Sequence, residues 1–290
     1  MKTLFVVNPV SGSSSNDKAI LCIHEKAVVM ETDFKFCYTS GSNDTETILE
    51  QIEDFKPDRV VAGGGDGTVQ LVARVLMGKN IPMAILPLGS ANGLATALQI
   101  PARIEDAVEL SMTGNNIKPL DILRFDGKHY CTHLADMGIN ARMVKRYAEE
   151  GGSGMMGYMK FLLQSIKESP LLNYTVKTPE GIYHKEGYMC AFANAHMYGT
   201  GIHISKGSVS DGKFEIVNVE RVALDAAIKA GLTKFNVFID QDMFSDVISC
   251  TKAEITIDKP VDFQIDGEYM GEINHLHIDI LSSYLRIVIP

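Results

Sequence analysis

The first 120 residues alternate short apolar runs with segments that carry apolar residues at helical spacing. The apolar runs, which predict strands, cover residues 3–7, 34–38, 60–62 and 83–86, and the predicted helices cover residues 18–30, 44–55 and 69–77. Apolar strands interleaved with helices are typical of a parallel sheet covered on both faces. We therefore predict a doubly wound α/β domain over residues 1–120.

Beyond residue 120 the pattern changes to strand-like segments, several of which alternate apolar and polar residues. The predicted strands cover residues 121–125, 129–135, 173–178, 188–194, 213–219, 253–257, 261–265, 275–280 and 284–289, and two predicted helices lie near residues 155–168 and 222–231. Many short alternating strands are typical of an antiparallel sandwich. Residues 121–290 are predicted to form this second, β-rich domain.

Charge and composition narrow the classes of protein. The 27 basic and 36 acidic residues give a net charge of −9, and the absence of a long basic block argues against nucleic acid as a partner. Five scattered cysteines without a CxxC pair favour free thiols in a reducing compartment. An early apolar run ends at Asn8-Pro9, too soon for a signal peptide, and no apolar stretch approaches the ~20 residues of a membrane span. We expect a cytoplasmic protein, with peripheral contact at the inner membrane face compatible with the sequence.

The strongest local motif is GGGDGT at residues 63–68, which follows an apolar strand and precedes a helix. Glycines leave the main-chain N–H groups open to phosphate oxygens, and the start of a helix favours an anion. Asp66 is the only carboxylate of this turn, which suggests Mg²⁺ handling or proton abstraction. A tight turn without a ligand is the alternative. Two further loops, at residues 8–12 and 87–92, are expected at the same edge of the sheet, where α/β folds bind ligands.

Five stretches together resemble the diacylglycerol kinase catalytic-domain superfamily, which includes bacterial lipid kinases and sphingosine kinases. They are NPVSG at 8–12, GGGDGT at 63–68, PLGSANGLA at 87–95, YGTGIHISKGSVSDGKFEI at 198–216 and DGE at 266–268. The resemblance implies an α/β nucleotide domain of the NAD kinase and phosphofructokinase type, followed by a β-rich domain. It also implies Mg²⁺-dependent transfer of a phosphoryl group from ATP to a lipid hydroxyl.

The resemblance also assigns residues, position by position. It implies that the nucleotide is contacted by Asn8, Pro9, Val10, Ser11, Gly12, Thr39, Gly64, Gly65, Asp66, Gly67, Thr68, Val69, Gln70, Ser90 and Asn92. Glu268 falls where bacterial members place the general base, and Asp66 where sphingosine kinases place it. A structural Mg²⁺ would be held by Asp211 and the main-chain carbonyls of Ser208 and Lys213, oxygen ligands that suit this ion.

Each of these assignments has a plainer alternative. Asp266-Gly267 and Asp211-Gly212 are also ordinary turn sequences, so Glu268 and Asp211 could simply follow or form turns between strands. The family's usual asparagine-glutamate pair after the glycine turn is here Gln70-Leu71, and its usual aspartate after Asn92 is Gly93. These departures leave open which hydroxyl compound accepts the phosphoryl group and how fast the reaction runs.

Two other functions stay open on this basis. NAD kinases also carry GGDGT and phosphorylate a ribose hydroxyl, although the PLGSAN loop and the DGE motif favour the lipid branch. A nucleotide-binding protein without catalysis is the second alternative, suggested by Leu71 and Gly93. The expected partner is a lipid or amphiphilic acceptor, and both transient contact with a membrane surface and a homodimer are compatible with the sequence.

Basic and histidine residues supply two further candidates. Arg142, Lys145 and Arg146 could meet an anionic head group, although a solvated helix face is the simpler interpretation. His275 and His277 point to the same face of a predicted strand. Such spacing suits zinc, but no cysteine or carboxylate completes a set in the sequence, so we expect no metal there.

Overall fold

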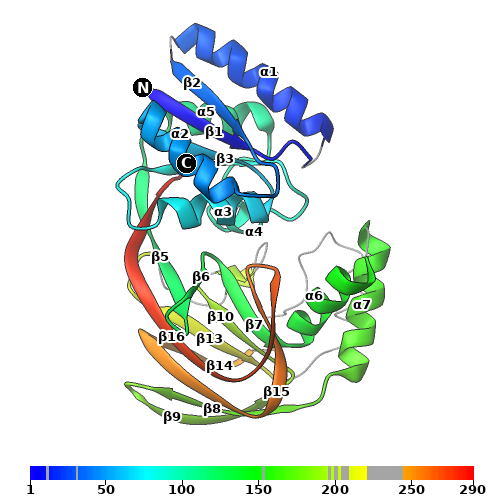
Figure 1. Cartoon of the computed structure of the whole chain (residues 1–290). Coiled ribbons are helices and arrows are strands. Elements are labelled where there is room, and N and C mark those ends of the chain that lie inside the picture. Colours follow the sequence, from blue (N-terminus) through cyan, green and yellow to red (C-terminus); the bar gives the residue numbers. More distant parts are fainter. Residues whose placement is uncertain are drawn as a thin grey trace. The chain divides into compact units, whose positions relative to one another are not determined.

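The computed structural model describes residues 1–10, 13–30, 32–151, 154–194, 197–198, 202–203, 209–220 and 244–290. The chain divides into two compact units. Unit 1 contains residues 1–120 and 283–290, and unit 2 contains residues 121–282. Figure 1 shows the elements of both.

Unit 1 is built on a parallel sheet. Its strands lie in the order β2 (Asp33–Tyr38), β1 (Lys2–Val7), β3 (Arg59–Gly64) and β4 (Met83–Pro87). All three neighbouring pairs are parallel. The end of β16 (Glu268–Val288) continues the sheet next to β4, where Ile287 pairs with Met83 in parallel orientation. The carboxyl ends of β1, β3 and β4 therefore meet at one edge.

Helices cover this sheet on both faces. On one face, α1 (Ser13–Met30) and α5 (Ile104–Thr113) join a buried cluster with alternate residues of the strands, including Phe5, Val61 and Leu86. α2 (Asp44–Phe55) and α3 (Asp66–Leu76) pack against β1, with further contacts from α2 to β2 and from α3 to β3 and β4. A short helix, α4 (Gly93–Ala97), follows β4. The predicted parallel α/β architecture is therefore confirmed. Helices lie on both sides because the strands of a parallel sheet are buried on both faces.

Unit 2 is dominated by antiparallel strands. Its main path runs β14-β13-β10-β7-β15-β16, with β8 and β9 added beside β15, and β5 and β6 added beside β16. The bounds are β5 (Ile117–Phe125), β6 (His129–Cys131), β7 (Leu134–Gly138), α6 (Ile139–Glu150), α7 (Gly154–Glu168), β8 (Leu172–Thr178), β9 (Gly181–Gly187), β10 (Met189–Ala193), β11 (Met197–Tyr198), β12 (Ile202–His203), β13 (Phe214–Val219), β14 (Phe244–Cys250) and β15 (Lys252–Ile265). Residues from most of these strands form one buried core, as expected for the predicted sandwich-type domain.

Several elements differ from the sequence prediction. The two strands expected at 253–257 and 261–265 are one strand, β15, with a shift in its pairing to β16 between Thr256 and Val261. Helix α6 and strand β9 were not predicted; β9 alternates exposed and half-buried residues, so its apolar signal is weak. The helix expected at 222–231 lies outside the described residues. The segment 283–290, assigned to the second domain from sequence, lies in unit 1 because it pairs with β4.

Among the described residues, no helix is both long enough and apolar enough to cross a membrane.

A fully buried carboxyl group lies inside unit 2. Asp136, on β7, has no exposed surface, and its Oδ2 accepts hydrogen bonds from Asn140 Nδ2, at 2.6 Å, and from the Gln264 side-chain amide. Burial raises the pKa of Asp136 to about 7, although the hydrogen bonds from Asn140 and Gln264 act in the opposite direction. The folded chain therefore holds a proton here that an unfolded chain releases near pH 4.

We expect the stability of unit 2 to fall between pH 4 and pH 7 because of this group. Over that window the folded state binds the extra proton, so the free energy of unfolding declines by about 1.4 kcal/mol per pH unit. Asp136→Asn should remove this component and stabilise the protein at pH 8 more than at pH 5. Urea denaturation at both pH values measures it, with Asp258→Asn, at an exposed aspartate of β15, as control. Equal effects of Asp136→Asn at both pH values would contradict the assignment.

Candidate functional site

The glycine turn lies between β3 and α3 in unit 1. Gly63 and Gly64 end the buried strand, Gly65 is extended, and α3 begins at Asp66. The main-chain carbonyl of Gly65 accepts the N–H groups of Thr68 and Val69, at 3.0 and 3.1 Å. This arrangement places the first turn of α3 at the carboxyl edge of the sheet, where helix N–H groups favour an anion.

The loop after β4 packs tightly against this turn. The N–H of Leu88 donates to the carbonyl of Gly64 at 2.9 Å. A Cβ placed on Gly89 would lie 2.4 Å from the Cα of Gly65 and 2.9 Å from Asn92 Oδ1. Glycine is therefore required at position 89 so that the two backbones can approach each other.

Asp66 ties the two loops together through its side chain. Its Oδ2 accepts the main-chain N–H of Asn92 at 2.9 Å, and its Oδ1 accepts that of Gly93 at 2.7 Å. Asn92, in the left-handed region with φ 52°, closes its own loop: its Oδ1 accepts the N–H of Gly89, and its Nδ2 donates to the Gly89 carbonyl. Each Asp66 oxygen thus accepts a main-chain N–H, and together these two hydrogen bonds hold the loop after β4 against the glycine turn.

A pocket of about 470 Å³ opens beside the glycine turn. It is lined by Asn8, Pro9, Val10, Thr39, Ser40, Gly41, Asp44, Gly65, Gly67, Thr68 and Leu71. Seven of these residues were predicted from sequence to contact a nucleotide. The structure therefore brings together parts of two of the three predicted loops, at residues 8–12 and 63–68, with Thr39. Leu71 lines the pocket where the family pattern has a carboxylate, and the wall therefore lacks that charge.

Ser40, Gly41 and Asp44 were not predicted, and they form one small structure. The Asp44 carboxylate accepts the N–H groups of Ser40 and Gly41, at 2.8 and 2.9 Å, and the Ser40 hydroxyl at 3.1 Å. The hydrogen bond from the Ser40 N–H is the main cause that lowers the pKa of Asp44. Asp44, the first residue of α2, thus fixes the rim of the pocket.

The other predicted nucleotide residues lie elsewhere. Gly64, Val69 and Gln70 are buried and do not line the pocket, and Ser90 is exposed on the loop after β4. Asn92 lines a second hollow of about 380 Å³, together with Gly89 and residues of α4. Ser11 and Gly12 lie outside the described residues.

In unit 2, the DGE motif forms the turn between β15 and β16. Asp266 and Gly267 both have positive φ, 47° and 86°, which is the geometry of a two-residue hairpin turn. The exposed Glu268 is the first residue of β16 and pairs with Ile265. The N–H of Gly267 donates to Gln264 Oε1 at 2.7 Å, and the same Gln264 side chain bonds the buried Asp136.

Asp266 anchors this turn to the segment before β7. Its Oδ2 accepts the N–H and the hydroxyl of Thr132, at 2.8 and 2.9 Å. Its Oδ1 accepts the N–H groups of His133 and Leu134, both at 3.0 Å, and the Cys131 thiol at 3.2 Å. The backbone that carries Glu268 is therefore held by a carboxylate with several donors.

The turn that contains Asp211 precedes β13. Asp211 is exposed, and its Oδ1 accepts the N–H of Lys213 at 3.0 Å. Gly212, with φ 73°, donates its N–H to Oδ2 of the buried Asp121 at 2.7 Å. Carboxylate and carbonyl oxygens are donors that suit Mg²⁺. Ser208, the third predicted ligand, lies outside the described residues.

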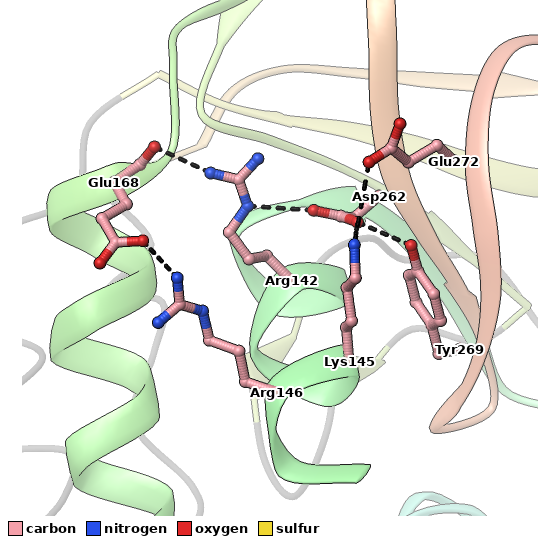
Figure 2. A network of polar contacts seen from close by, with 7 residues as sticks. All are labelled: Arg142, Lys145, Arg146, Glu168, Asp262, Tyr269 and Glu272. Atoms are coloured by element: carbon pink, nitrogen blue, oxygen red, sulfur yellow. Dashed lines mark hydrogen bonds and ion pairs between the residues drawn. The ribbon is translucent and has the colours of Figure 1, made fainter. Parts of the chain in front are cut away.

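The basic residues of α6 form ion pairs inside unit 2 (Figure 2). Arg142 Nε and Lys145 Nζ lie 3.0 and 3.2 Å from the two oxygens of Asp262, whose side chain is 4% exposed. Tyr269 donates its hydroxyl to the same carboxylate at 2.8 Å. Burial acts to raise the pKa of Asp262, but hydrogen bonds from Tyr269, Arg142 and Lys145 bring it below its ordinary value. Arg146 pairs with Glu168. These cations are neutralised within the fold, which argues against a head-group site here.

Two family models match nearly the whole chain. The diacylglycerol kinase catalytic domain matches residues 2–125, and the YegS C-terminal NAD kinase beta sandwich-like domain matches residues 134–289. The chain belongs to the YegS-like family of the diacylglycerol kinase type. The resemblance seen in the sequence is therefore confirmed.

Relatives of this YegS-like chain include proteins named "Probable lipid kinase YegS-like". One comes from Yersinia pestis (strain Pestoides F) and another from Yersinia pseudotuberculosis serotype O:3 (strain YPIII). Each is 26% identical over 298 residues, covering 99% of this chain and 97% of the relative.

Solved structures support the same fold. A diacylglycerol kinase from Bacillus anthracis str. Sterne matches with a TM-score of 0.72 at 18% identity, covering 100% of this chain and 97% of that chain. Another structure from the same strain gives a TM-score of 0.77 at 20% identity, with the same coverage.

The close approach of the two loops in unit 1 can be tested by adding a methyl group. We expect Gly89→Ala to lower the free energy of unfolding by roughly 1–3 kcal/mol, because two backbones must separate. Nothing lies within 4 Å of a Cβ on Gly67, so Gly67→Ala should leave stability unchanged or slightly raised. Thermal and urea denaturation of both variants give the comparison. Equal losses of unfolding free energy in both variants would show that the close approach of Gly89 to Gly65 does not require glycine at position 89.

The anchor of the DGE turn can be tested separately. Asp266→Ala should destabilise unit 2 by about 3 kcal/mol, since several N–H donors lose a charged acceptor. Hydrogen–deuterium exchange should quicken at residues 132–134. Asp258→Ala, at an exposed aspartate of β15, the strand before this turn, is the matched control. Unchanged exchange at these three amides would mean that other contacts hold the turn.

Proposed function

We propose that this protein is an ATP- and Mg²⁺-dependent lipid kinase that phosphorylates a hydroxyl group of diacylglycerol or a related amphiphile. The observation that carries the proposal is the pocket beside the glycine turn, in a chain whose two parts match a lipid-kinase family from end to end. The relatives named as lipid kinases cover the same full length.

The pocket supports the nucleotide half of the reaction. Gly65, Gly67 and Thr68 line it at the start of α3, where main-chain N–H groups can neutralise phosphate oxygens. A volume of about 470 Å³ lies within the range of small-molecule sites. In this proposal, Asn8 to Gly12 and Thr39 contact the rest of the nucleotide, and Ser90 and Asn92 belong to the loop that supports the phosphate site.

Proton transfer is assigned to Glu268 rather than to Asp66. Both Asp66 oxygens already accept main-chain N–H groups, so this carboxylate is better suited to hold the loops. Glu268 is exposed, and hydrogen bonds of Asp266 and Gly267 hold the turn that precedes it. The acceptor oxygen attacks the γ-phosphorus as its proton passes to Glu268, the bond from that phosphorus to the β,γ-bridging oxygen breaks, and ADP leaves.

Mg²⁺ would be held in unit 2 by Asp211 and the carbonyls of Ser208 and Lys213. The exposed carboxylate on a turn fits this ion, since Mg²⁺ takes few protein oxygens and keeps several waters. When bound there, the ion would neutralise the carboxylate and hold the turn before β13.

The central test compares two carboxylate variants with the wild type. Transfer of labelled phosphate from ATP with Mg²⁺ is measured on diacylglycerol and other lipids in mixed micelles, and on NAD. Glu268→Gln should lower kcat by about 10²–10⁴-fold while ATP binding and thermal stability stay unchanged. Asp66→Asn should instead weaken ATP binding and lower the melting temperature, because one of its two N–H contacts loses its acceptor.

Glu272→Gln, at an exposed glutamate of the same strand β16, is the control and should keep full activity. Product on NAD alone would place the protein with the NAD kinases. ATP binding without product on any acceptor would contradict the proposed reaction. Full lipid activity in Glu268→Gln would overturn the assignment of the base alone.

A further inference from the structure

The paired strands β8, β15 and β16 bring together a set of side chains that the sequence keeps apart. Glu254 on β15 lies directly opposite His277 on β16 and Lys177 on β8, and His275 lies two residues from His277 on the same face. Sequence alone does not link Glu254 to these histidines, because 20 residues and a hairpin turn separate it from His275.

Three of these groups present potential metal ligands to one another. A carboxylate oxygen of Glu254 and one ring nitrogen from each of His275 and His277 all lie within 4.8 Å of one another. His275 Nε2 is 3.1 Å from Glu254 Oε1, and the two imidazole rings have centroids 4.5 Å apart. Ligands around a tetrahedral zinc ion at 2.0–2.1 Å are about 3.4 Å apart. Small side-chain rotations would thus complete the geometry.

The backbone of this region is well fixed. Asp126, in the turn after β5, accepts the N–H of His277 through Oδ1 at 2.9 Å and donates its own N–H to the carbonyl of His277 at 2.9 Å. The histidine strand is therefore fixed on one side by Asp126 and on the other by β15. A metal ion would meet ligands whose main chain is already in place, which lowers the cost of binding.

We propose that Glu254, His275 and His277 form a binding site for a borderline divalent cation of the Zn²⁺ type. Two imidazoles and one carboxylate are a known zinc ligand set that leaves one position for water, and imidazole nitrogen disfavours Mg²⁺. Along β16, His275 and His277 lie seven and nine residues from Glu268, roughly 23–30 Å at the rise of an extended strand. The site is independent of the residues assigned to the kinase reaction.

Lys177 is the group that competes with the metal. Its Nζ lies 3.5 Å from Glu254 Oε2, and the hollow beside the site, about 440 Å³, is also lined by Lys252 and Arg124. Arg124 is paired with Asp279 through two hydrogen bonds. Removal of the Lys177 charge should therefore strengthen metal binding, whereas a simple glutamate–histidine pair without metal affinity would not respond in this way.

The test uses the full-length protein without an affinity tag, treated with a chelator and then kept in excess Mg²⁺. Isothermal titration with Zn²⁺ should show one equivalent bound. Glu254→Gln and His275→Asn should each weaken binding at least about tenfold, and the double variant His275→Asn/His277→Asn should abolish it. Lys177→Met should strengthen it by up to about fivefold, the range of an exposed ion pair. His184→Asn, an exposed histidine on β9, should have no effect.

Cobalt substitution identifies the ligands. Co²⁺ should give the visible absorption of a four-coordinate site without the near-ultraviolet thiolate bands that the five cysteines would produce. Lipid kinase activity should be unchanged in all these variants, so that a failure of the proposed function and a failure of this site are separate results. An absence of saturable Zn²⁺ binding, thiolate bands, or undiminished binding in the double histidine variant would overturn the proposal.

Discussion

The candidate sites among the described residues depend on one kind of interaction, the hydrogen bond from a main-chain N–H group to an aspartate side chain. Asp66 joins the glycine turn to the loop after β4, and Asp44 closes the rim of the pocket. Asp266 holds the turn before Glu268. Loops rich in glycine lose much conformational entropy when they fold. A carboxylate that accepts two or more N–H groups offsets this cost, because charge-assisted hydrogen bonds are strong. The candidate loops can thus be rich in glycine and still keep a defined conformation.

Much of this could be predicted from sequence because the signals are local. The parallel sheet followed from alternating apolar strands and helices, and the resemblance followed from five short motifs that span the chain. Residues such as Asn8, Gly67 and Thr68 lie together at the pocket because they follow strands whose carboxyl ends share one edge. The glycine turn and the DGE hairpin carry their conformation in their own residues, so no tertiary information was needed for them.

What could not be predicted depends on pairing across the sequence. The sequence offered no carboxylate for His275 and His277, and only the register of β15 with β16 places Glu254 beside them. Val69 and Gln70 were predicted to contact the nucleotide, yet the orientation of α3 buries both. Arg142 and Lys145 on α6 were candidates for an anionic head group or a solvated face, but both pair with Asp262 on a strand distant in sequence. Each case turns on a partner more than 20 residues away or on the rotation of a helix, which periodicity alone does not fix.

The assignment of residues 283–290 to unit 1 has a consequence for how that unit folds. Because residues 283–290 belong to unit 1, unit 2 is an insertion within it, and the sheet of unit 1 stays incomplete until the segment after unit 2 pairs with β4. The entry and exit of the insertion meet at one turn: Asp121 accepts the N–H of Gly212, and a Cβ on Gly212 would lie 3.2 Å from the Ser282 hydroxyl. A folded unit 2 therefore shortens the loop between Met83 and Ile287, whose closure would otherwise cost roughly 5 kcal/mol of chain entropy. Folding of the inserted unit therefore lowers the entropy cost of closing the sheet in the unit that surrounds it.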